Sequence, residues 1–208
     1  MYTPEHFEEN DPQILHDLIR EFSFALLVTA QNGTPVGTHL PMLVEAKGVN
    51  GILFGHVARA NNHWRQFDGG TEAMAVFQGP HSYISPNWYA NEGLVPTWNY
   101  ASIHAYGRPQ AIEDPGETTD ILWRLVEANE TDATGNWSMS RLPSHEVKKQ
   151  IKGIVAFRMP IDRLEGKFKM GQNRPPEDVM AAAKGLRAAD HGDAEMVAAE
   201  MEARAQKG

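Results

Sequence analysis

The sequence predicts a mainly β protein of the α+β class: an antiparallel β-barrel with peripheral helices and a helical C-terminal tail. Short apolar or alternating runs, typical of strands, recur between residues 24 and 170. Hairpin-length turns join most of these runs, which favours antiparallel pairing over a doubly wound parallel sheet with helical crossovers. After Pro175-Pro176 the chain is rich in Ala, Met, Glu and Lys and has no Trp, Tyr or Phe. We therefore expect a barrel domain over residues 1–176 and a helical extension over residues 177–208.

The first part of the chain contains the clearest hairpin. Asp11-Pro12, followed by apolar residues at helical spacing, predicts a capped helix over residues 11–22. The run Phe24–Ala30 predicts a strand, and Asn32-Gly33 predicts a tight turn into a return strand over residues 36–44. Further signals predict a hairpin step at 47–51, a strand over 52–57, a helix over about 58–67 and a strand over 73–78.

The second part of the chain begins with a segment that has no clear period. Residues 80–97 contain three prolines, so we expect a long ordered loop there. The remaining elements, in chain order, are a strand over 100–112, helices that begin at Pro115 and Pro143, a short strand over 154–157 and a last strand over 163–170. We expect Pro160 to end the short strand, because proline cannot donate to a strand ladder.

The composition excludes several kinds of chemistry. The chain has no cysteine, which rules out disulfides, thiolate zinc sites, iron–sulfur clusters and cysteine nucleophiles. No apolar run approaches the roughly 20 residues that span a bilayer, and the acidic start MYTPEHFEEN is unlike a signal peptide. We therefore expect a cytoplasmic protein that is not bound to membranes. Serine-hydrolase, P-loop and Rossmann motifs are absent and the histidines lack metal-ligand spacing, so we expect no metal site.

Charge is distributed unevenly along the chain, whose net charge is −8. Residues 1–140 carry 6 basic and 17 acidic side chains, whereas residues 141–174 carry 9 basic and 3 acidic ones. Binding to nucleic acid depends on many Lys and Arg contacts with phosphates, so we do not expect direct DNA binding. The basic stretch is an anion site, or a set of solvated partners for the acidic half.

The strongest candidate site is formed by the strand Ile52–His56, the tight turn Val57–Ala60 and a helix start capped by Asn61. A helix N-terminus offers unpaired backbone N–H groups, and Arg59 could add a guanidinium fork to phosphate oxygens. His56 could supply a further donor. The alternative is that Asn61 only caps the helix and that Arg59 pairs with an acidic residue.

Two other groups of residues could bind a ligand. Strand alternation places Lys167 and Lys169 on one face, which suits a shared anionic ligand or an edge strand protected by lysines. His104 and Tyr106 share a strand face and suit a haem or a proton transfer, or a hydrogen-bonded structural role. Five aromatic residues could wall a planar ligand or form part of the core: Tyr83, Trp88, Tyr89, Trp98 and Tyr100.

Several ordered motifs together resemble the PaiB family, whose members are described as FMN-binding negative transcriptional regulators. The motifs are Met1-Tyr2-x-Pro4-x-His6-Phe7, His56-Val57-Ala-Arg59-Ala-Asn61, Ala75-Val-Phe77-Gln-Gly-Pro80, Tyr83-Ile-Ser-Pro86-x-Trp88-Tyr89, Val95-Pro-Thr-Trp98-Asn-Tyr100 and Lys167-Phe-Lys169-x-x-Gln172-Asn173-Arg174. The resemblance ends at about Pro175. It implies an FMN-binding split β-barrel of the pyridoxamine-phosphate-oxidase and flavin-reductase-like type, and a homodimer with the flavin at the subunit interface.

The resemblance also implies which residues contact the cofactor. It assigns the ribityl-phosphate cradle to the segment His56-Val57 with Arg59 and Asn61, and it places His39 beside the ring system. Further candidates for the ring edge or the partner subunit's share of the site are Phe77, Gln78, Ser85, Trp98, Asn99, Lys169, Gln172 and Arg174. The chain departs from the family at Phe168 and Gly171, where Trp and Ser are common, so the family's indole N–H and hydroxyl are missing.

Three functions follow as hypotheses. The first is a dimeric FMN-binding negative regulator that senses a flavin or metabolite signal. The second is an FMN-dependent oxidoreductase or flavin reductase, or a haem-handling relative with His104 or His39 as ligand, in which the cofactor carries the chemistry. The third is a scaffold that keeps the fold without the flavin.

Overall fold

The computed structural model describes residues 1–31 and 33–206, so Asn32 of the predicted turn lies outside the described residues. The described chain divides into two compact units, each built from separate stretches of sequence. Unit 1 comprises residues 1–15, 78–103 and 165–206, and unit 2 comprises residues 16–77 and 104–164. The long strands β6, β7 and β9 contribute residues to both units.

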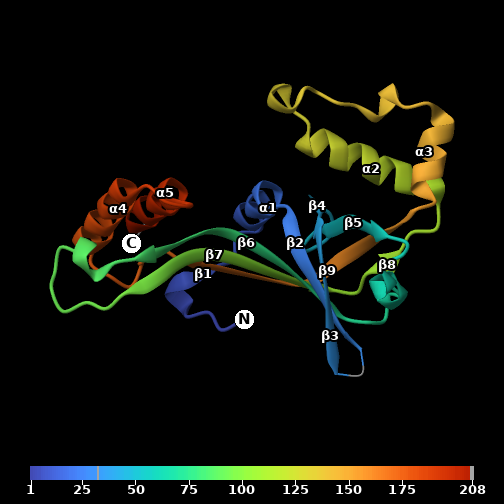
Figure 1. Ribbon diagram of the computed structural model, residues 1–208. Helices are drawn as coiled ribbons and strands as arrows, with labels where there is room; N and C mark the ends of the chain where they lie inside the picture. Colours follow the sequence, from blue (N-terminus) through green and yellow to red (C-terminus); the bar gives the residue numbers. More distant parts are fainter. Residues whose placement is uncertain (32, 207–208) are drawn as a thin grey trace. The chain divides into compact units, whose positions relative to one another are not determined.

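Nine strands are assigned in the described residues, and Figure 1 shows their course. They are β1 (Glu8–Glu9), β2 (Phe24–Gln31), β3 (Thr34–Pro41), β4 (Leu43–Glu45), β5 (Ile52–Ala58), β6 (Ala73–Ile84), β7 (Thr97–Gly107), β8 (Gln110–Ala111) and β9 (Ile154–Lys169). The α-helices are α1 (Pro12–Glu21), α2 (Pro115–Asn129), α3 (Ser144–Ile151), α4 (Pro176–Ala189) and α5 (Ala194–Ala205). Short 3-10 helices include η2 (Asn62–Gln66) and η3 (Pro86–Trp88). No helix in the described chain is both long and apolar enough to cross a bilayer.

Unit 2 is built on antiparallel strand pairs, as the hairpin-length turns predict. Strand β2 pairs with β3 and with β6, and β5 pairs with β4 and with β9. Alternate residues of β2 point inward, and Ala25, Leu27 and Thr29 are buried. Gly55 on β5 allows close packing, because a Cβ there would meet Leu40 and the ring of Phe157 at 3.1 Å.

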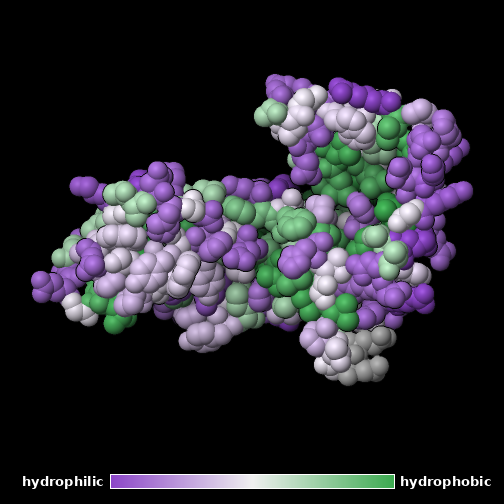
Figure 2. Space-filling view, viewed as in Figure 1, coloured by the Kyte–Doolittle hydropathy of each residue, from purple (hydrophilic) through white to green (hydrophobic). Residues whose placement is uncertain are grey.

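Helix α2 covers an apolar part of unit 2. Ile121 and Leu125 on one face of α2 pack with Phe54 of β5 and Ala156 of β9. The cap at Asp114 accepts from the Glu117 N–H at 2.7 Å, as expected for a helix with Pro at its first position. Figure 2 shows apolar surface gathered beside this helix. The apolar residues of α2 recur at helical spacing because this face of the helix packs against the strands.

Unit 1 contains the C-terminal helices, which pack against each other and against the η3 loop. Gly185 of α4 lies against Trp88, where an added Cβ would approach the indole within 2.4 Å. Arg187 of α4 pairs with Glu195 and Glu202 of α5. Apolar residues of both helices are buried, including Leu186 and Val197. The residues of the predicted extension form two helices that pack within unit 1.

Three expectations about the strands and helices are wrong. Strand β9 continues through Pro160, which pairs with Ile52 at the last position of the β5 register, where a missing N–H breaks little of the ladder. Strand β6 extends to residue 84, and residues 81–84 alternate between exposed and buried, so the predicted loop is shorter. The helix expected over 58–67 is the five-residue 3-10 helix η2.

Candidate functional site

The segment predicted to cradle an anion begins at His56, near the end of β5. His56 pairs with Ala156 of β9, and its ring is half-buried. Its Nδ1 atom is buried, and no hydrogen-bond partner for it exists among the described residues. Burial lowers the pKa of His56, so the imidazole is neutral near pH 7. An unpaired buried ring nitrogen is uncommon, which makes this position a candidate site.

Arg59, which follows β5, is held by main-chain carbonyl groups of its own chain. Its Nε donates to the Lys152 oxygen at 3.0 Å, and its Nη2 donates to the Ile154 oxygen at 2.9 Å. The Arg59 backbone N–H donates to the Gly153 oxygen at 2.8 Å. These bonds fix the guanidinium in orientation, and within the described residues they use two of its five N–H donors.

Asn61 caps the helix start, as the sequence predicts. Its side-chain oxygen accepts from the His63 N–H at 3.1 Å, and its amide donates to the Thr38 hydroxyl at 3.0 Å. The helix that it caps, η2, is a 3-10 helix of five residues. Its dipole is therefore smaller than that of the expected α-helix.

A buried polar network beside this cap was not predicted. The His63 ring is bonded on both sides, with Nε2 2.8 Å from the Thr29 hydroxyl and Nδ1 2.8 Å from the Thr38 hydroxyl. Thr29 also donates to Gln66 at 2.6 Å. Burial lowers the pKa of His63. The signal that could have revealed the network is the position of Thr29 on the inward face of a strand, where apolar residues are usual.

His39 lies on an open sheet face of unit 2, which we call the hairpin face. The His39 ring stacks on Phe24 with centroids 6.1 Å apart and an interplanar angle of 21°. Phe24 is 67% exposed. Cross-strand pairing places further outward residues of β2 and β6 on this face: Leu26, Val28, Met74 and Val76. A flat and largely apolar surface of this kind suits a planar ring or a second protein surface.

The other predicted site residues have mixed environments. Val57 and Phe77 are buried, so their side chains belong to the interior. Gln78 lies near His81, with 3.4 Å between Nε2 and Nδ1. Ser85 caps η3 by accepting from the Asn87 N–H at 3.3 Å, and Asn99 is buried in unit 1.

The predicted residues of the 169–174 segment lie in unit 1, with Trp98. Lys169 donates to the Trp98 carbonyl oxygen, and Trp98 is 55% exposed. Gln172 braces the turn by accepting from the Met170 N–H and donating to the Phe168 oxygen. The Arg174 guanidinium lies over the Tyr89 ring at 5.6 Å.

The two departures from the family pattern have structural explanations. Phe168 is buried, and the Arg204 guanidinium of α5 lies 4.0 Å from its ring centroid. Gly171 has a φ of +92°, a conformation that favours glycine over serine. Both residues therefore shape unit 1 and are adapted to its packing.

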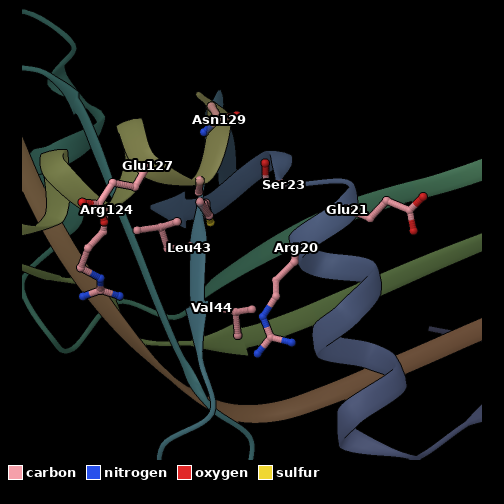
Figure 3. A pocket seen from close by; sticks show the side chains of 10 residues that line it. Arg20, Glu21, Ser23, Leu43, Val44, Arg124, Glu127 and Asn129 are labelled. Atoms are coloured by element: carbon pink, nitrogen blue, oxygen red, sulfur yellow. The ribbon is translucent and has the colours of Figure 1, made fainter. Parts of the chain in front are cut away.

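A separate cleft of about 560 Å³ lies in unit 2 between α1, β4 and α2 (Figure 3). Leu43 and Val44 form apolar walls, and Arg20 and Arg124 point along different sides of β4. Arg124 pairs with Glu45 at 2.6 Å. None of the predicted cofactor residues lines this cleft. Within the described residues, no three acidic or histidine side chains gather as a metal site would require.

Comparison with known proteins decides the family. Residues 1–163 match the family described as "Putative FMN-binding domain". The chain is 32% identical over 207 residues to the Bacillus subtilis protein named protease synthase and sporulation protein PAI 2, covering 100% of this chain and 99% of that protein. The chain belongs to the PaiB family. A protein of Emericella nidulans is also 32% identical, over 83% of this PaiB-family chain.

Solved structures identify the fold of this PaiB-family chain. The flavocytochrome Anf3 from Azotobacter vinelandii aligns with a TM-score of 0.62 and 17% identity, covering 78% of this chain and 69% of that one. A protein described as FAD- and haem-binding, from Mycobacterium smegmatis, aligns with a TM-score of 0.56 and 16% identity, covering 78% and 73%. The fold is the split β-barrel, which confirms the predicted fold class.

Proposed function

We propose that this chain binds FMN as a homodimer, with the flavin between two copies of the chain. Membership of the PaiB family supports flavin binding, and the phosphate end suits the segment from His56 to Asn61. The observation that carries the proposal is the buried, unpaired Nδ1 atom of His56 in that segment. A neutral imidazole can donate or accept one hydrogen bond at that atom.

The hydrogen-bond donors of this segment suit the oxygen atoms of a flavin phosphate. Arg59 is fixed by two carbonyl groups and keeps unused N–H groups that suit phosphate oxygens. The Asn61 amide donates to the Thr38 hydroxyl at 3.0 Å. When bound, FMN supplies a ring that accepts and donates electrons or hydride. The chain's own residues bind and orient that ring.

The hairpin face supports the homodimer and the position of the ring. Phe24 and His39 form an exposed stacked pair, and the outward side chains beside them are apolar. A second copy laid on this face would exclude water from the ring and bury the apolar surface. We expect Phe24→Glu to dissociate the dimer in analytical ultracentrifugation and to release flavin, while Val49→Glu, at an exposed loop position of unit 2, changes neither.

The test of flavin binding is the absorption spectrum of freshly purified protein, followed by denaturation and identification of the released chromophore. We expect FMN. Free FMN at about one hundred times its Kd should then stabilise the fold by roughly 2.7 kcal/mol. A colourless protein whose melting temperature is unchanged by FMN would overturn the proposal and favour a scaffold.

We further infer that any regulatory role acts through the flavin or a metabolite and not through direct reading of DNA. The basic residues of the 141–174 stretch do not form one free patch. Arg158 pairs with Glu117, Lys149 pairs with Glu146, and Lys167 is buried. We expect no gel shift of promoter DNA at low salt; a salt-sensitive shift would contradict this inference.

An FMN-dependent oxidoreductase is the second candidate. Its support is the fold, which this chain shares with the flavocytochrome Anf3. Hydride transfer by a flavin does not always need a protein acid or base, so the chemistry could rest on the cofactor. Oxidation of NADH or NADPH by FMN-loaded protein supports this candidate, and no turnover with either nucleotide supports the sensor. A Soret band on haemin titration would instead indicate haem binding.

A further inference from the structure

Two threonines of the β2–β3 hairpin in unit 2 point to the same inward face. Figure 1 shows these two strands side by side, and Leu27 of β2 pairs with Thr38 of β3. Thr29 lies two residues along β2 from the buried Leu27. Because side chains alternate along a strand, Thr29 and Thr38 both lie on the face that Leu27 occupies. Their hydroxyl groups are therefore diagonal neighbours across the two strands.

The His63 ring of η2 bridges these two hydroxyl groups. Its Nε2 atom lies 2.8 Å from the Thr29 oxygen, and its Nδ1 atom lies 2.8 Å from the Thr38 oxygen. The ring is buried, and burial lowers the pKa of His63, so the imidazole is neutral near pH 7. A neutral imidazole carries a single N–H, so one ring nitrogen of His63 donates and the other accepts.

The second partner of Thr29 decides which ring nitrogen carries the hydrogen. The Thr29 hydroxyl donates to Oε1 of Gln66 at 2.6 Å, and a hydroxyl has only one hydrogen to give. Thr29 therefore meets the ring as an acceptor, so Nε2 of His63 carries the hydrogen. Nδ1 is then the acceptor, and it receives the hydrogen of the Thr38 hydroxyl.

Asn61 stands at the other end of this series of hydrogen bonds. Its Oδ1 atom accepts from the main-chain N–H of His63 at 3.1 Å, which fixes the orientation of the amide. Its Nδ2 atom donates to the Thr38 oxygen at 3.0 Å. The Thr38 oxygen is free to accept this bond because its own hydrogen points to His63. The amide of Asn61 has a second N–H, which this bond does not use.

Every hydrogen in the series thus points the same way. Each member donates to the next, in the order Asn61, Thr38, His63, Thr29 and Gln66. The last three side chains are buried, with exposures of 2%, 2% and 8%. A reversed hydrogen at one member would place two donors or two acceptors against each other in the interior, which is unfavourable. We call these five side chains the threonine–histidine relay.

We propose that His63 is a positioning residue, which acts through Thr38 to hold the Asn61 amide with an N–H available to an anionic oxygen of the bound cofactor. A phosphate oxygen is an acceptor, so Asn61 can contribute only when its nitrogen, and not its oxygen, is offered. This inference rests on the proposed binding of FMN at residues 56–61. His63, Thr29 and Gln66 act through Asn61 and not by touching the ligand.

The tautomer of His63 tests the relay without any ligand. Nitrogen-15 NMR of the full-length protein with labelled histidine distinguishes Nε2–H from Nδ1–H, and the His63 signal is assigned by its loss in His63→Gln. We expect Nε2–H in the wild type. Thr29→Val removes the acceptor of that hydrogen with little change of shape, so we expect the ring to change to Nδ1–H. Thr29→Ser keeps a hydroxyl and should keep Nε2–H. A wild-type ring with Nδ1–H would overturn the proposal.

The preference for FMN over riboflavin, which lacks the phosphate, tests the effect of the relay on the ligand. With Nδ1–H, the Thr38 hydrogen turns away from His63 and competes with the Asn61 amide. We expect Thr29→Val to lower this preference about two- to ten-fold, which corresponds to one hydrogen bond. Thr29→Ser should restore it, and Thr34→Val, at an exposed position of β3, should not change it. A role in stability alone would weaken Thr29→Val in urea and leave the preference unchanged, which would contradict the proposal.

The outcomes separate this inference from the proposed function. If the wild type prefers FMN and folded Thr29→Val has the same preference, the positioning role fails and flavin binding stands. If the wild type binds neither FMN nor riboflavin, the proposed function fails and the positioning role fails with it. If Thr29→Val does not fold by circular dichroism, Thr38→Val replaces it, because Thr38 is only half-buried. We expect Thr38→Val to lower the preference for FMN by a similar factor, and an unchanged preference would again contradict the proposal.

Discussion

Arg59 in unit 2 and Lys169 in unit 1 were both expected to contact an anion, but their surroundings differ. Two donors of Arg59 are bonded to carbonyl groups from residues 152 and 154, so the side chain is a structural brace with donors left over. Lys169 is half-buried beside the buried Lys167, and no ion pair of Lys169 exists in the described chain. A basic residue in a motif is thus ambiguous until its own hydrogen bonds are known. Arg59 is a cation that is already bonded to the protein, whereas Lys169 is a cation without a counter-charge in the described chain.

The largest expected loss of stability concerns the buried hydrogen-bond network around His63 in unit 2. His63→Leu removes the ring that joins Thr29 and Thr38, and each hydroxyl loses a buried partner. We expect the free energy of unfolding to fall by about 2–4 kcal/mol, measured by urea denaturation. His145→Leu, at an exposed position of α3, should change it by less than about 0.5 kcal/mol. A similar small effect at His63 would show that the network contributes little.

A smaller loss is expected when Arg59 is replaced by alanine. The carbonyl groups of Lys152 and Ile154 then lose a charged donor, which we expect to cost about 1–2 kcal/mol because water can replace part of it. Arg108→Ala is the matched control, since Arg108 forms an exposed ion pair with Asp162 and should contribute less than about 1 kcal/mol. Equal losses of unfolding free energy in the two variants would show that Arg59 does not brace the main chain.

The pH dependence of stability follows from the buried imidazoles of unit 2. Burial lowers the pKa of His56, His63 and His104 below 6.5, so the unfolded chain binds more protons than the folded one below that pH. The free energy of unfolding should therefore fall as pH decreases from about 7 through 6.5 towards the folded-state pKa values. Urea titrations at several pH values measure the slope, and His56→Gln should reduce it. A stability that rises on acidification over this range would contradict the burial of neutral rings.

The smallest effect is expected in unit 1. Gly171→Ser restores the residue that is common in the family, but a φ of +92° strains any side chain. We expect a loss of about 1 kcal/mol, because a Cβ there would meet only ordinary contacts with Val179 at 3.4 Å. Gly70→Ser is the control, because a Cβ there would meet only Asp68 at an ordinary 3.6 Å and the φ is not positive. A stabilising Gly171→Ser would mean that the turn relaxes when substituted.

Local patterns in the sequence predicted much of the fold and only part of the site. The Asn61 cap, strand β2 and helix α2 follow from short-range spacing and were correct. The partners of Arg59 lie more than 90 residues away, so no local pattern could reveal them. Pro160 was expected to end a strand, but its register at the end of β5 removes the penalty.

The ratio of the riboflavin to FMN dissociation constants measures whether this chain holds the phosphate of FMN near Arg59. Riboflavin lacks the phosphate and keeps the ring. We expect wild-type protein to bind FMN about ten- to one hundred-fold more tightly than riboflavin, since hydrogen bonds to a charged group contribute about 1.5–3 kcal/mol. In Arg59→Ala this ratio should fall towards one, while Arg108→Ala keeps the wild-type ratio. An unchanged ratio in folded Arg59→Ala would contradict the account.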